Sequence, residues 1–266
     1  MINEIICIGT SFTEGHGLNP RKCLSDTISV DPAVIWYKEN KGIEIKSMGE
    51  YAWPSILKKL SGIKTRNLGK CGSSIEYLMR NVEHILERED VSDKFFILEY
   101  SNWGRSELWS PTRNEWLVAN WGPRDGYDPT TEGYAVMITT DYNFGYQSEP
   151  SELTIYEKYL DTFFNEKEYL IQRDKYFLNL LYKLKAKNIK YSILGLEPPF
   201  WEELLVDDLF HSNVLNKTNL WKDVMDLKIT LGDLSPEIGT DGHPSIEGHE
   251  YIANLIYTAL KERGEI

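Results

Sequence analysis

The amino-acid sequence predicts an α/β protein with a central parallel sheet. Short apolar runs alternate along the 266-residue chain with longer stretches whose apolar residues recur at helical spacing. That alternation is typical of a parallel sheet covered by helices on both faces. Small or polar residues follow several of the apolar runs, as at the ligand-binding edge of such sheets. We therefore expect a three-layer α/β/α sandwich with about five strands.

The elements of this fold are expected in order along the chain. The apolar run EIICIG at 4–9 is the first strand, and KFFILEYS at 94–101 is the most apolar one. Between them we expect a helix at 51–62, a short strand at 64–70 and a helix at 75–89 that Ser74 caps. A long amphipathic stretch at about 152–187 leads to a strand at 189–197, and an amphipathic helix at 245–264 ends the chain.

One segment, at about 103–150, breaks this alternation. It is rich in Trp, Tyr, Gly, Pro and Asp, and it is too long for an ordinary connection and too aromatic for disorder. We expect an ordered insertion, with a small hairpin around GYAVMITTDYNFGY at 133–146. Residues 1–266 are otherwise expected to form a single domain.

Charge and composition exclude several function classes. The net charge of −12 disfavours binding to nucleic acid or to an anionic membrane. The sequence shows no apolar run of about 18 residues and no signal-peptide pattern at its start, so we expect a cytoplasmic protein. The oligomeric state is left open.

The cysteines point to neither a disulfide framework nor a zinc site. There are three of them, Cys7, Cys23 and Cys71, with no CxxC spacing. Cys7 is expected in the core of the first strand. A catalytic role for Cys71 is disfavoured, and no metal or organic cofactor is expected.

Two distant segments suggest a serine hydrolase. Ser11 directly follows the first strand in IGTSFTEGHG, where it is either a nucleophile or a residue that caps the next loop. Near the other end, GTDGHPSIEGH places His243 before a proline and a helix, with Asp241 two residues earlier. A histidine can accept the proton of a serine nucleophile while an aspartate orients its ring.

Donors for an oxyanion are expected at two further strand ends. NLGKCGSS offers the backbone N–H of Gly72, with Gly69 as the fallback, and EYSNWG offers the side-chain amide of Asn102. With the N–H of Ser11 these groups complete a candidate oxyanion hole.

Together the four segments resemble, in order, the motif blocks of the SGNH/GDSL hydrolase family. Ser11 matches its nucleophile, Gly72 its glycine block, Asn102 its asparagine block and His243 its base. Thr10 stands where the family carries an aspartate, and Asp241 is one residue closer to the histidine than is usual. The triad acid is therefore Asp241, Asp233 or a backbone carbonyl. The resemblance implies a flavodoxin-like sheet and a metal-free acyl-enzyme mechanism.

The expected activity is hydrolysis of a small acyl ester, with an O-acetylated carbohydrate as the favoured substrate. Residues that could contact the substrate are Thr10, His16, Trp103 and Arg105. A surface loop position is the default interpretation of His16, and a structural ion pair that of Arg105 with Glu107. Acyl transfer through the same site and a non-catalytic carbohydrate-binding or structural module are the alternatives.

Overall fold

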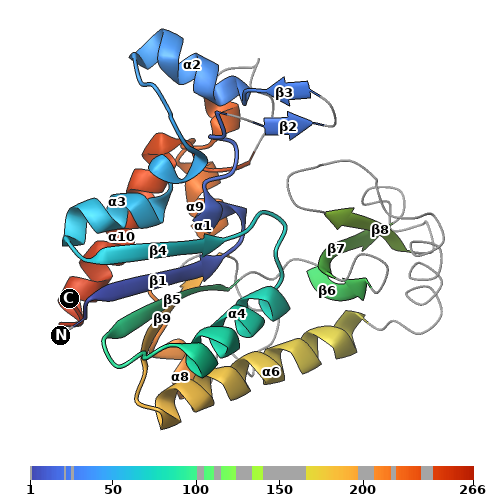
Figure 1. The fold of residues 1–266 in the computed structure, drawn as a ribbon, viewed down its shortest axis with the longest axis vertical. Coiled ribbons are helices and arrows are strands. Elements are labelled where there is room, and N and C mark those ends of the chain that lie inside the picture. Colours follow the sequence, from blue (N-terminus) through green and yellow to red (C-terminus); the bar gives the residue numbers. More distant parts are fainter. Residues whose placement is uncertain are drawn as a thin grey trace.

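The computed structural model describes residues 2–20, 22–24, 27–100, 105–110, 115–123, 134–139, 166–196, 207–216, 220–234 and 242–266. Its main sheet is parallel and has the strand order β4-β1-β5-β9 (Figure 1). These strands are β1 (Glu4–Gly9), β4 (Lys64–Gly69), β5 (Lys94–Tyr100) and β9 (Lys190–Gly195). This is the order of the first four strands of flavodoxin-like folds. The predicted α/β class is therefore confirmed.

The expected fifth strand is represented, in the described part of the chain, by a single bridge. Val214 pairs in parallel with Ile193 of β9. The N–H of Ile193 donates to Asn213, and the N–H of Leu215 donates back to Ile193, both at 2.8 Å. The segment 213–215 thus extends the sheet beyond β9 by one residue pair.

Helices cover both faces of the sheet. Successive side chains of β1 point to opposite faces, and both sets are apolar, so both faces must be covered. Ile6 and Ile8 pack in a cluster with α4 (Ile75–Arg88) and α6 (Glu166–Ala186). Ile5 and Cys7 point to the opposite face, where α3 (Trp53–Ser61) and α10 (Ile246–Glu262) pack. Figure 1 shows these helix pairs on either side of the sheet. Every residue of β1 is buried, which explains its continuous apolar run.

A third apolar cluster, absent from the sequence predictions, supports the start of α10. It includes Tyr37 of α2 (Pro32–Lys41), together with Leu18 and Ile246. The Tyr37 hydroxyl donates to Glu247 Oε2 at 2.6 Å and accepts from the N–H of Ile246 at 2.9 Å. The hairpin β2 (Lys22–Leu24) and β3 (Thr27–Ser29) precedes α2. This cluster fixes the helix that follows His243.

The aromatic segment contains an antiparallel three-stranded sheet in the order β6-β7-β8. Its strands are β6 (Arg105–Ser110), β7 (Glu115–Pro123) and β8 (Tyr134–Thr139). Residues 134–139, the first half of the hairpin expected at 133–146, form β8 and pair with β7. The second half of that hairpin, 140–146, lies outside the described residues. Glu107 of β6 forms a two-bond ion pair with Arg80 of α4, at 2.6 and 2.9 Å. Arg80 is thus a partner of Glu107, and this pair joins the small sheet to α4.

The described residues also contain five short helical segments. They are the α-helices α1 (Ser11–Glu14), α8 (Asp208–His211) and α9 (Leu220–Asp226) and the 3-10 helices η1 (Met48–Glu50) and η2 (Leu231–Asp233). Within the described part of the chain, no helix is both long enough and apolar enough to span a membrane.

Candidate active site

The carboxyl end of β1 places Ser11 at the edge of the main sheet. β1 ends at Gly9, and Ser11 opens the one-turn helix α1. The carbonyl of Ser11 accepts hydrogen bonds from the N–H groups of Gly15 and His16, at 3.0 and 3.1 Å. Gly15 ends the helix with a φ of 90°, a left-handed conformation that favours glycine. The backbone around Ser11 is therefore closed into a tight turn, and Ser11 is only 2% exposed.

The buried carboxylate of Glu99, which was not predicted from the sequence, fixes this turn by hydrogen bonds. Glu99 lies on β5, is 1% exposed, and accepts from the N–H of Thr10 at 2.9 Å. It also accepts from the hydroxyl of Thr10 and, at 2.5 Å, from the hydroxyl of Thr13. Gly9 makes room for this contact, because a Cβ at that position would lie 2.5 Å from Glu99 Cβ. The side chain of Thr10 is thus directed to Glu99.

The turn after β4 lies beside α1. The N–H of Ser73 donates to the carbonyl of Lys70 at 3.0 Å, and Gly72 has a φ of 75°, as at the third position of a type II turn. Lys70 N–H and the Ser73 hydroxyl both donate to the Gly9 carbonyl, at 3.0 and 2.9 Å. The turn is therefore anchored to the end of β1.

Of the two glycines in this segment, Gly69 has a structural role. Its N–H donates to Asn67 Oδ1 at 2.8 Å. A Cβ on Gly69 would lie 2.3 Å from the Glu14 amide nitrogen, so its missing side chain lets α1 pack directly on β4. Because that N–H already has an acceptor, Gly72 is the better candidate for an oxyanion donor.

The loop before α10 brings His243 to the same edge of the sheet. The His243 carbonyl accepts from Leu231 N–H at 2.9 Å, and Pro244 forms a bridge with Thr230. Ser245 then caps α10 by accepting from Gly248 N–H at 3.1 Å. With its backbone fixed, the half-buried His243 ring contacts the ring of Phe12 at 6.0 Å between centroids and that of His16 at 4.7 Å. Residues from opposite ends of the chain therefore meet beside Ser11.

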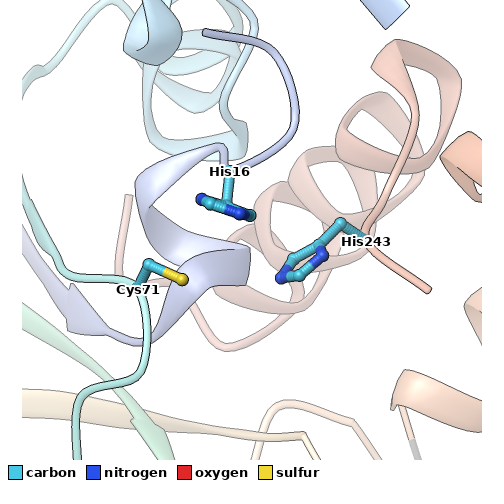
Figure 2. A group of neighbouring side chains, drawn as sticks. All are labelled: His16, Cys71 and His243. Atoms are coloured by element: carbon cyan, nitrogen blue, oxygen red, sulfur yellow. The ribbon is translucent and has the colours of Figure 1, made fainter. Parts of the chain in front are cut away.

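Figure 2 shows Cys71 pointing toward these two histidines. The ring nitrogens of His16 and His243 and the sulfur of Cys71 offer three donor atoms that all lie within 4.8 Å of one another. This is the group of side chains in the described residues that could hold a metal ion.

A second histidine lies close to His243 but is sealed inside the protein. His249 on α10 is fully buried, and neither of its ring nitrogens has a hydrogen-bond partner among the residues that the structure describes. Burial, with a smaller contribution from the charge of His243, lowers the pKa of His249 to about 3. The ring is therefore neutral near pH 7, and the interpretation of His249 as a structural residue agrees with its position.

The structure describes only some of the candidate acids and the remaining predicted site residues. Asp233, one of the candidate acids, accepts from the N–H of Thr230 at 3.2 Å and from its hydroxyl, as a cap of η2. Asp241, Asn102 and Trp103 lie outside the described residues. Arg105 begins β6 and pairs with Asn120 in the small sheet.

No family model matches the chain, and no curated protein matches it in sequence. Comparison with solved structures gives neighbours that align with 97% of this chain at 12% identity. One, assigned to the lipolytic G-D-S-L family, is from Desulfitobacterium hafniense (99% of that chain, TM-score 0.45). Another G-D-S-L member is from Veillonella parvula (96%, TM-score 0.41), and a third is an acetylxylan esterase from Geobacillus stearothermophilus (94%, TM-score 0.34).

Proposed function

We propose that this protein is a serine ester hydrolase of the SGNH type, with Ser11 as nucleophile and His243 as base. One observation carries the proposal. The His243 ring contacts Phe12 and His16, which lie directly after Ser11 and after the helix that Ser11 opens. The proposed base and the proposed nucleophile, from distant parts of the sequence, therefore lie at one edge of the sheet, where α/β folds bind ligands.

The proposed reaction has two halves. Ser11 Oγ attacks the ester carbonyl while His243 takes its proton, and the resulting oxyanion accepts hydrogen bonds from the N–H groups of Ser11 and Gly72 and the amide of Asn102. The intermediate collapses to an acyl-enzyme, and His243 returns the proton to the leaving alcohol. Water then repeats the sequence and releases the acid. Asp241 is the proposed partner that orients His243.

Glu99 is the proposed positioning residue for the nucleophile. Its carboxylate accepts from the N–H of Thr10, the residue directly before Ser11. That amide therefore points into the protein, and the hydrogen bond fixes the peptide plane that leads into Ser11. A carboxylate from β5 thus supports the position where the resembled family carries an aspartate next to its serine.

The proposed substrate is a small acyl ester, with an O-acetylated carbohydrate favoured. The net charge of −12 disfavours an anionic lipid, and the aromatic residues of the 103–150 segment offer flat apolar faces for a neutral sugar ring. The protein is proposed to act in the cytoplasm.

The test is hydrolysis of an aryl acetate and of acetylated xylose by the wild type, Ser11→Ala and His243→Ala. Each substitution should lower kcat/KM by about a thousandfold or more, as for residues that act as one catalytic unit. His84→Ala, which changes an exposed histidine on α4, is the matched control and should retain the wild-type rate. Equal rates in wild type and Ser11→Ala would contradict the proposal, and binding of the sugar without turnover would favour a non-catalytic module.

A further inference from the structure

The three donor side chains beside Ser11 form a metal-binding geometry that sequence spacing does not reveal. His16 follows α1, Cys71 lies in the turn after β4, and His243 lies in the loop before α10. Their donor atoms lie within 4.8 Å of one another, and Figure 2 shows the side chains converging from three separate segments. Each residue is half-buried, so solvent and ions reach the group.

We propose that His16, Cys71 and His243 bind a zinc ion, and that this ion inhibits the proposed hydrolase by holding His243. A thiolate and two imidazoles are ligands that zinc prefers, and three protein ligands leave the fourth position of a tetrahedral site to water. Zinc bonds of about 2.0–2.1 Å to nitrogen and about 2.3 Å to sulfur place tetrahedral ligands roughly 3.4–3.6 Å apart. In the structure the donor atoms lie within 4.8 Å of one another, so binding would draw the three side chains closer together.

The backbone of each ligand is already fixed, which lowers the entropic cost of binding. The N–H of His16 donates to the Ser11 carbonyl, and the carbonyl of His243 accepts from Leu231. The N–H of Cys71 donates to Glu14 Oε2 at 2.7 Å. Glu14 is itself buried, so this hydrogen bond holds the turn that carries Cys71 against α1.

The inhibitory effect rests on the proposed function. The nitrogen of His243 that coordinates zinc uses its lone pair in that bond, so it cannot accept the proton of Ser11. Binding releases the thiol proton of Cys71 to solvent, forms three coordinate bonds and involves no oxidation or reduction. Removal of the ion by a chelator restores the free imidazole, so zinc inhibition should be reversible.

The binding claim is tested by titrating the reduced, metal-free protein with Co²⁺ as a spectroscopic substitute for zinc. We expect one ion per chain, a thiolate-to-cobalt charge-transfer band in the near ultraviolet, and displacement by zinc. Cys71→Ser should abolish the band. His16→Ala should weaken cobalt binding by about tenfold or more, because loss of a ligand should cost at least as much as loss of a residue that supports a ligand. His84→Ala is the matched control for His16→Ala, because His84 is exposed on α4. Absence of the band in the wild type, or its persistence in Cys71→Ser, would overturn the site.

The inhibitory claim is tested by comparing each variant's ester hydrolysis in buffered zinc with its own rate in chelator. The wild-type rate should fall about tenfold or more in zinc and recover in chelator, and this ratio should approach one in Cys71→Ser. Cobalt binding with an unchanged wild-type rate in zinc would overturn the inhibition but keep the site. A wild type that is inactive in both conditions would count against the proposed hydrolase alone, because the cobalt titration needs no activity.

Discussion

The carboxylate of Glu99 accepts a hydrogen bond from the backbone amide of Thr10, 89 residues earlier in the chain, at 2.9 Å. This contact joins the end of β1 to the end of β5 directly before Ser11. The buried carboxylate also accepts hydrogen bonds from the hydroxyls of Thr10 and Thr13. The segment that leads into Ser11 is thus fixed by a side chain from a neighbouring strand.

Removing this carboxylate should destabilise the protein and misplace Ser11. Glu99→Ala leaves the Thr10 amide and the two hydroxyls without their acceptor, at a cost of about 3 kcal/mol or more in the free energy of unfolding. Glu99→Gln keeps the shape and one acceptor oxygen, so its cost should be about half as large. Urea unfolding measures both, with Glu87→Gln on the exposed face of α4 as the control. Equal stability of Glu99→Ala and the wild type would contradict this role.

An alanine side chain at Gly69 should destabilise the protein, whereas one at Gly49 should leave its stability unchanged. In Gly69→Ala the new Cβ would meet the backbone of α1, with the Glu14 nitrogen at 2.3 Å and the Thr13 carbonyl carbon at 2.6 Å. Such overpacking costs about 1–3 kcal/mol and should displace α1 together with Ser11. Gly49→Ala is the matched control, because its Cβ would have nothing within 4 Å. Thermal unfolding and ester hydrolysis of both variants provide the comparison; similar melting temperatures would refute the packing argument.

His249 should make the protein less stable as the pH falls below about 6.5. Burial lowers the pKa of His249 to about 3 in the folded protein, while the unfolded chain takes up a proton near pH 6.5. Between these values the unfolded state binds more protons, so the free energy of unfolding falls with decreasing pH by up to about 1.4 kcal/mol per unit from this group.

The measurement is urea unfolding between pH 7 and 5 for wild type and His249→Leu. The variant lacks the titrating group, so its stability should change less across this range, although carboxylates contribute to both proteins. The same pH dependence in both proteins would show that the buried ring does not carry this effect.

The main elements of the fold are readable from local sequence because each has a strong apolar period. β1 has the predicted bounds, 4–9, and the helix expected at 75–89 is α4 at 75–88. The alternation of Ile5 and Cys7 with Ile6 and Ile8 gives both sheet faces an apolar surface. The helix α2 was missed, because its apolar residues form only a weak helical face and it is stabilised by packing on the start of α10.

The site was less predictable, because its parts meet only in the folded chain. Ser11 and His243 carry recognisable local patterns, and the structure brings their segments together. Glu99 lies within the apolar run KFFILEY, where nothing local indicates that its carboxylate reaches Thr10. The group of His16, Cys71 and His243 has no regular spacing in sequence, so the absence of a CxxC motif was no guide to it.

Covalent labelling tests whether Ser11 is an activated nucleophile, as proposed. The wild-type protein is treated with a fluorophosphonate in the presence of chelator, and the modified peptide is identified by mass spectrometry. We predict one label per chain, located on Ser11, with no label in Ser11→Ala and much slower labelling in His243→Ala. An unlabelled wild type, or a label that persists in Ser11→Ala, would contradict the account.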